Sequence, residues 1–278
     1  MPGRCWAYGC DPVSKPDTVV LIHGLFMTAF SWERWVERYT ARGYKVVAPS
    51  WPRMEGDIAE LRRDPSRLGG LGIAEIVDHF DRIIRALDAP PIIVGHSFGG
   101  AFTEMLLDRG LGAAGVAIDA AQLRGVYNIP LSQLRALFPI VRNPLNRGRA
   151  VAMTHSQFHY AFTNTISFEE SKAAYDRYAV PGPGRVLFEA ALANLNRSSP
   201  IQVDFARRER APLLIVAGGA DHIVPASLNA ATARKYARSG AVTDYKLFPD
   251  RSHWTIAEPG WEEVADHAID WCERHTAG

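Results

Sequence analysis

A serine between two glycines is the first group in this sequence that could carry out covalent chemistry. Ser97 lies in the segment Gly95-His96-Ser97-Phe98-Gly99, which follows the apolar run 92–94 and precedes a predicted helix. A serine on a sharp strand-to-helix turn has strained backbone angles, and the flanking glycines let strand and helix approach closely. Its hydroxyl would lie at the helix N-terminus, where the helix dipole favours developing negative charge. The pattern predicts a nucleophile; the structural alternative is a glycine-rich turn with a capping serine.

A carboxylate and an imidazole, which could together activate such a serine, also follow apolar runs. Asp221 comes after the run 213–217, and His253 comes shortly after the run 245–248. In an open parallel sheet, ligands bind at the carboxyl ends of the strands. We therefore expect Asp221 and His253 to lie near Ser97 at one edge of a sheet.

A second aspartate competes for the role of the acid. Asp119 closes the apolar run 115–118, whose carboxyl end should lie on the same edge. We favour Asp221, because the tight turn at Gly218-Gly219 can aim a short side chain. The strand before that turn should also neighbour the strand that leads to His253.

The loop after the first apolar run could stabilise negative charge. The run 18–22 continues into His23-Gly24-Leu25-Phe26. A backbone N–H of this loop, together with the N–H of Phe98, could bind one developing oxyanion. We expect His23 to be structural and to bond the loop backbone.

The elements that must position these groups alternate along the chain. Short runs rich in Val and Ile predict strands that are buried on both faces, and apolar residues at helical spacing lie between them. The predicted strands are 18–22, 45–48, 92–94, 115–118, 213–217 and 245–248, and the apolar stripes of the predicted helices run over 32–39, 73–87 and 261–272. This order predicts an α/β fold with a mostly parallel, doubly wound sheet.

The alternation stops between residues 120 and 210. This stretch contains helix-like clusters, prolines and many aromatic residues, but no run typical of a buried strand. It is too long for an ordinary loop, so we interpret it as a helical cap inserted into a core of residues 1–119 and 211–278. Apolar walls under such a cap would form the substrate pocket. We expect Phe26, His96 and Trp254 to contact the substrate.

The order Ser97, Asp221, His253, with an early His-Gly pair and a central G-x-S-x-G, resembles the α/β-hydrolase superfamily. The resemblance covers the whole chain and implies a fold of that type with a cap. It also implies that Ser97 is the nucleophile, His253 the general base and Asp221 the residue that orients the imidazole. The backbone N–H groups of Leu25 and Phe98 would form the oxyanion hole.

Composition and motifs exclude several other classes of protein. The formal net charge is +1 with no basic run, so no nucleic-acid partner is expected. No apolar run approaches the roughly 20 residues that span a bilayer, so we expect no membrane partner. Neither a P-loop nor a G-x-G-x-x-G opening the first helix is present, so no cofactor is expected. The expected partner is a small-molecule substrate, and the oligomeric state is open.

Histidines and cysteines give weaker signals. His155 and His159 are four residues apart, but a metal site would need further ligands, so we expect no metal. Cys5, Cys10 and Cys272 are an odd number in a chain that can bury its own core, which favours free thiols and a cytoplasmic location.

These residues together favour hydrolysis of a carboxylic ester through an acyl-enzyme. Apolar esters of small to medium size are the expected substrates, because the cap is aromatic and no surface-seeking amphipathic helix is evident. Hydrolysis of a C–C bond, a lactone or an amide by the same three side chains is the alternative among enzymes. A ligand-binding receptor that kept the fold without turnover is the alternative from another class.

Overall fold

The computed structural model describes residues 15–276 and is built on one parallel sheet. Six strands lie in the order β2-β1-β3-β4-β7-β8, and every neighbouring pair is parallel. Their bounds are β1 (Thr18–Ile22), β2 (Lys45–Val47), β3 (Ile92–His96), β4 (Ala114–Ile118), β7 (Leu213–Gly218) and β8 (Thr243–Phe248). The predicted α/β class and all six predicted strands are confirmed, with ends shifted by no more than two residues.

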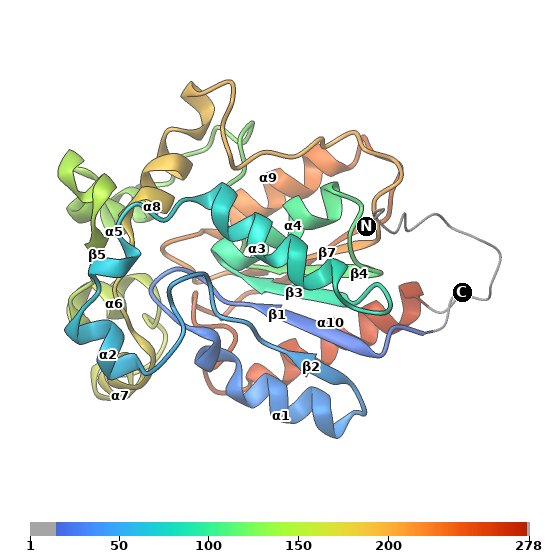
Figure 1. Cartoon of the computed structure of the whole chain (residues 1–278), viewed down its shortest axis with the longest axis horizontal. Helices are drawn as coiled ribbons and strands as arrows, with labels where there is room; N and C mark the ends of the chain where they lie inside the picture. Colours follow the sequence, from blue (N-terminus) through green and yellow to red (C-terminus); the bar gives the residue numbers. More distant parts are fainter. Residues whose placement is uncertain (1–14, 277–278) are drawn as a thin grey trace.

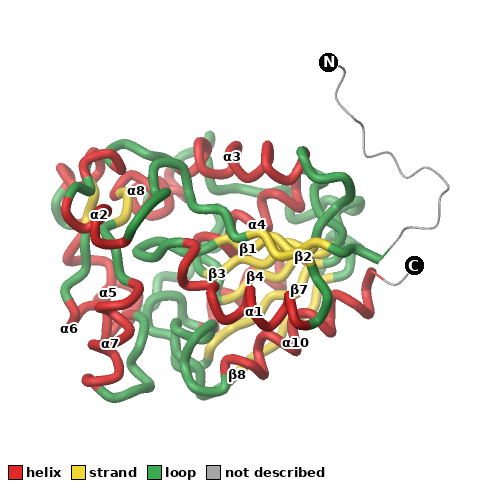
Figure 2. Tube along the Cα trace, turned by 60° about the horizontal axis from the view of Figure 1, so that its bottom comes forward, coloured by secondary structure: helices red, strands yellow, loops and turns green. Residues whose placement is uncertain are grey.

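Helices cover both faces of this sheet, as Figure 2 shows. One face carries α1 (Glu33–Ala41) and α10 (Trp261–Thr276), and the other carries α3 (Ile73–Arg85), α4 (Phe98–Asp108) and α9 (Ala226–Tyr236). The strand residues alternate between the two cores: Val19 and Leu21 pack on the α1 and α10 side, whereas Val20 and Ile22 pack on the other. Burial on both faces explains why the strands are apolar at nearly every position.

The residues between β4 and β7 gather at one end of the sheet (Figure 1). They form α5 (Leu131–Val141), η3 (Pro144–Gly148), β5 (Ala150–Val151), α6 (His155–Ala161), α7 (Phe168–Tyr178), β6 (Gly182–Pro183), α8 (Gly184–Ala191) and η4 (Ala193–Leu195). The two-residue strands β5 and β6 were not predicted, but they pair only with each other and add nothing to the main sheet. Local signals start two of the helices, since Thr154 with Gln157 and Ser167 with Glu170 form capping boxes.

A segment outside this stretch packs against it. The helix α2 (Ile58–Arg63) and the short turn η2 (Ser66–Leu68) lie beside these helices in Figure 1. The guanidinium of Arg62 donates to the backbone carbonyls of Tyr175, Asp176 and Ala179 at the end of α7. The helical layer over the sheet edge therefore draws on residues from before β3 as well as after β4.

Two further expectations concern the cysteines and the membrane. Cys272 is a free, fully buried thiol in α10, and burial raises its pKa, whereas Cys5 and Cys10 lie outside the described residues. No helix within residues 15–276 is both long and apolar enough to span a bilayer.

Candidate active site

Ser97 stands at the sharp turn between β3 and α4. Its φ of 56° and ψ of −120° are unusual for a residue with a side chain. The close packing leaves no room for side chains at the flanking glycines. A Cβ atom on Gly95 would come within 2.0 Å of the Gly99 carbonyl oxygen, and one on Gly99 within 2.0 Å of the Ile22 carbonyl oxygen. The strained serine is therefore held by strand and helix in contact.

The loop after β1 lies against the same turn. An added Cβ atom on Gly24 would come within 2.8 Å of the Ser97 Cβ atom, so this loop is next to the serine. Phe26 has a φ of 69°, and its carbonyl oxygen accepts a hydrogen bond from Val180 N–H. Within the described residues, neither Leu25 N–H nor Phe98 N–H donates a hydrogen bond to a protein group. Two free donors beside Ser97 are what an oxyanion hole requires.

The structure brings Asp221 to His253. Asp221 Oδ2 lies 2.6 Å from His253 Nδ1, and both side chains are fully buried. Asp221 Oδ1 accepts hydrogen bonds from the backbone N–H groups of Ile223 and Val224, each at 2.8 Å. These two donors fix the carboxylate, so His253 presents Nδ1–H to it and keeps a lone pair on Nε2.

His253 Nε2 is buried, and no other group among residues 15–276 hydrogen-bonds to it. It also makes no hydrogen bond with Ser97 in this part of the chain. Catalytic hydrogen bonds are often long without substrate and tighten when it binds. The imidazole therefore has one nitrogen held and the other free to take a proton.

Asp119 lies near this pair without joining it. Its Oδ1 accepts a hydrogen bond of 2.6 Å from Gly218 N–H, whereas its Oδ2 is buried without a partner among the described residues. Burial, reinforced by the nearby carboxylate of Asp221, raises the pKa of Asp119 well above its usual range. The competing acid therefore bonds the β7 backbone, and its burial disfavours the ionised form.

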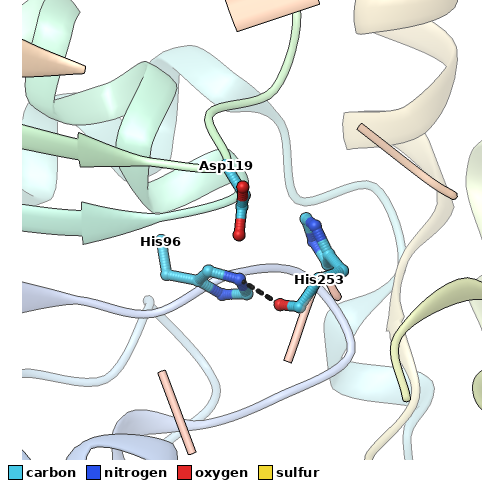
Figure 3. Close-up of side chains that lie close together, drawn as sticks. All are labelled: His96, Asp119 and His253. Atoms are coloured by element: carbon cyan, nitrogen blue, oxygen red, sulfur yellow. Dashed lines mark hydrogen bonds between the residues drawn. The ribbon is translucent and has the colours of Figure 1, made fainter. Parts of the chain in front are cut away.

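Two histidines near the site, His96 and His23, make hydrogen bonds to backbone groups. His96 Nε2 donates to the backbone carbonyl oxygen of His253 over 2.8 Å, as drawn in Figure 3. Burial lowers the pKa of His96 well below the ordinary value, so its ring is neutral. His23 lies 2.9 Å from the Gly24 carbonyl oxygen through Nδ1, and its Nε2 accepts from Trp51 N–H. His23 thereby ties the loop after β1 to the chain after β2.

An apolar cavity of about 380 Å³ opens above Ser97. Its walls come from the loop after β1 (Leu25, Phe26), the start of α4 (Phe98), α5 (Leu134, Leu137), α8 (Leu187) and the loop after β7 (Ile223, Val224). Of the three predicted substrate contacts, only Phe26 is among the lining residues. His96 lies beneath His253, and the Trp254 ring packs against Phe158 and Tyr178 at centroid distances of 6.2 and 5.2 Å. Most of the lining residues belong to the segment between β4 and β7.

A buried glutamate holds the loop that carries the histidine, and the sequence analysis missed it. Glu258 Oε1 accepts from Ser252 N–H at 3.0 Å, and Oε2 accepts from the hydroxyls of Ser252 and Thr165 at 2.9 and 2.6 Å. Glu258 is five residues beyond His253 in the sequence. Its only signal there is that it is a carboxylate in an otherwise weakly polar segment.

Neither group of histidines offers a clear metal site. His155 Nε2 lies 3.2 Å from Ser171 Oγ, and its ring packs on Phe168. Donor atoms of His96, Asp119 and His253 lie within 4.8 Å of one another, but this cluster includes the imidazole that Asp221 holds. We therefore interpret the cluster as the surroundings of His253.

Comparison with known families shows what kind of protein has this fold and site. A family model described as the alpha/beta hydrolase family matches residues 19–267, which is most of the chain. The chain therefore belongs to the alpha/beta hydrolase family, as its sequence motifs predicted. Comparison with curated protein sequences gives no significant match.

Solved structures with the same fold include several hydrolases. A monoacylglycerol lipase of Paleococcus ferrophilus is 21% identical with a TM-score of 0.68, covering 94% of this chain and 96% of that one. A thermophilic esterase of Thermogutta terrifontis is 18% identical with a TM-score of 0.65, covering 93% and 90%. A pyrethroid hydrolase of Sphingobium faniae is 17% identical with a TM-score of 0.61, covering 92% and 97%. At such identities the likeness is one of fold.

Proposed function

We propose that this protein is a serine hydrolase that cleaves carboxylic esters of small to medium size. The observation that carries the proposal is the buried, hydrogen-bonded pair of Asp221 and His253. The backbone carbonyl of His253 is bonded by His96, the residue before the strained Ser97, which lines an apolar cavity. His253 Nε2 has no hydrogen-bond partner among the described residues, and Asp221 holds Nδ1 of the same ring. Similar structures carrying the names esterase, lipase and hydrolase agree with it.

The chemistry follows from the atoms at the site. Ser97 Oγ attacks the ester carbonyl carbon while His253 Nε2 takes its proton, and Asp221 stabilises the imidazolium through Nδ1–H. The oxygen of the tetrahedral intermediate would accept hydrogen bonds from Leu25 N–H and Phe98 N–H. His253 then gives the proton to the leaving alcohol. Water, activated by the same nitrogen, releases the acid from Ser97.

Several finer assignments belong to the same proposal. We take residues 120–210 as a cap on a core of residues 1–119 and 211–278, because no strand of residues 120–210 joins the main sheet. We also keep a cytoplasmic location, on the cysteine usage, together with a small-molecule substrate and no nucleic-acid partner, cofactor or metal. Amide, lactone and C–C bond hydrolysis would use the same side chains, and no contact in the site favours one of them.

Hydrolysis of a soluble p-nitrophenyl ester tests the proposal. The wild-type protein should show turnover, and Ser97→Ala should reduce kcat/KM by at least about a thousandfold with unchanged thermal unfolding. The fold should survive, because the change removes one hydroxyl beside a cavity and no core volume. A protein that binds such esters without hydrolysing them would instead be the receptor alternative.

A further inference from the structure

Exposed apolar side chains gather at the mouth of the cavity. Six of them form what we call the apolar rim: Tyr127, Ile129, Leu131, Leu134, Phe138 and Leu195. Four of the six, Tyr127, Ile129, Leu134 and Leu195, also line the cavity above Ser97. Leu131 and Leu195 are 83% and 84% exposed, so the rest of the described chain covers little of either side chain. A contiguous apolar surface at the entrance of a pocket marks a place where another apolar phase or partner binds.

The helix α5 carries half of this rim. Leu131, Leu134 and Phe138 are spaced at i, i+3 and i+7, so they share one face of the helix and point to solvent. The opposite side of α5 is also apolar, because Ala136 and Ile140 are buried. One apolar side of α5 is therefore buried in the protein, and the other apolar side is exposed to solvent.

The segment that carries five of the six rim residues has charges of one sign. Residues 120–168 contain five arginines and no aspartate or glutamate, in a chain with a net charge of only +1. Four of these arginines are exposed on α5 and η3 or just after them: Arg135, Arg142, Arg147 and Arg149. None of the four is paired with a carboxylate of the described chain, whereas Arg42 and Arg109, just after α1 and α4, are.

Apolar side chains flanked by unpaired cations match a lipid surface that bears anionic headgroups. We propose that the apolar rim and its arginines dock on such a surface, and that the cavity takes amphiphilic esters from it. The docking does not depend on the reaction, whereas the substrate class rests on the proposed esterase function. Docking at an interface requires no membrane-spanning helix.

This proposal departs from the sequence-based expectation of no membrane partner. The sequence pattern of 131–141 did not reveal which apolar residues face outward, because both sides of α5 are apolar. A second copy of the chain is the competing occupant of the rim. A two-fold contact through this face would bring the same arginines of the two copies close together, and like charges oppose that contact.

Flotation with lipid vesicles tests the docking directly. The probes are phosphatidylcholine vesicles with and without phosphatidylglycerol, and the wild-type protein should bind preferentially to the anionic ones. Leu131→Ser with Phe138→Ser should lower the bound fraction about tenfold or more, because partition scales with the apolar area that is buried. The matched control is Val242→Ser with Leu247→Ser, which changes two exposed apolar residues away from the rim and should leave binding within about twofold.

Charge reversal tests whether the arginines contribute to docking. Arg142→Glu with Arg147→Glu should remove the preference for anionic vesicles, whereas Arg234→Glu with Arg238→Glu on or beside α9 should keep it at the same net charge.

Leu131 and Phe138 do not line the cavity, so their variant should hydrolyse a soluble ester at the wild-type rate. Vesicle binding that follows this pattern without any ester hydrolysis would support the docking and refute the esterase.

Two results would overturn the docking. One is wild-type binding that is equally weak with both vesicles and insensitive to the rim variant. The other is a wild-type dimer in light scattering that the rim variant converts to a monomer, since the rim would then be a contact between copies.

Discussion

At the scale of residues, Asp221 and Asp119 differ in the hydrogen-bond partners of their carboxylates. Asp221 is held by two backbone N–H groups and faces the imidazole, whereas Asp119 is buried with one oxygen unpartnered in the described chain. Asp221→Asn presents an amide to His253 Nδ1–H and should lower kcat by about 10³–10⁴-fold. Measurement of kcat for a soluble ester checks this.

Asp119→Asn is the matched control for that change. Burial raises the pKa of Asp119 and so disfavours its charge, and an amide oxygen at this position can still accept from Gly218 N–H. We expect a loss in kcat of less than about tenfold, in contrast with the large loss for the orienting acid. The reverse ranking of the two variants would make Asp119 the orienting acid.

His23 should make stability depend on pH. Burial lowers its pKa from 6.5 to about 4, so between these values the unfolded chain binds a proton that the folded chain does not. The free energy of unfolding should therefore fall on acidification from about pH 6.5 to about pH 4, and His23 should account for up to about 3 kcal/mol of that fall. Below the folded-state pKa the contribution is fully lost.

Denaturant unfolding at several pH values isolates this contribution. The difference between wild type and His23→Gln should shrink with falling pH across that window, because glutamine does not titrate. His79→Gln, on helix α3, is the control for replacing a histidine elsewhere in the chain. An equal slope in wild type and His23→Gln would show that this imidazole is not the acid-sensitive group.

At the scale of elements, the apolar runs were the most informative signal in the sequence. Strands such as β1 and β7 are buried on both faces, so nearly every residue is apolar and their positions could be predicted. The short helix α2 and the helix α9 lack such a pattern and were missed. The residues at strand ends were predicted because topology alone puts carboxyl ends on one edge.

The contacts inside the site were harder to predict. Which side chains line the cavity depends on how α5 and α8 pack over Ser97, and no periodicity in residues 120–210 encodes that packing. Trp254, adjacent to His253 in sequence, points into the aromatic cluster with Phe158 and Tyr178 instead of into the cavity. Adjacency in sequence is a poor guide at a turn, because successive side chains there point in different directions.

The cavity formed by these helices should limit the acyl chain. A volume of about 380 Å³ is near the lower end for small-molecule pockets. We expect kcat/KM across a series of p-nitrophenyl esters to peak at acyl chains of roughly two to eight carbons, because longer chains exceed such a pocket. A maximum at about sixteen carbons would refute this. Leu187→Trp, which fills the cavity from α8, should shift the optimum toward shorter chains.

At the scale of the whole molecule, the fold is that of the alpha/beta hydrolase family, and the proposed reaction needs only groups of the chain itself. Chelator should leave ester hydrolysis unchanged, because the proposed steps use only Ser97, His253, Asp221 and backbone N–H groups. The measurement is kcat/KM before and after treatment with EDTA. Inhibition that zinc restores would instead indicate a metal at His96, Asp119 and His253 or at His155 and His159.

Covalent labelling with a serine-reactive phosphonate tests whether Ser97 is the nucleophile. Phosphonates form a stable adduct with a serine that an adjacent base activates, and the adduct resembles the tetrahedral intermediate. We predict one adduct per chain by intact mass, located on Ser97 by peptide mapping, with loss of ester hydrolysis in proportion to labelling. The Ser97→Ala protein should take no adduct. Labelling of a different residue, or undiminished hydrolysis by the labelled protein, would show that Ser97 is not the nucleophile.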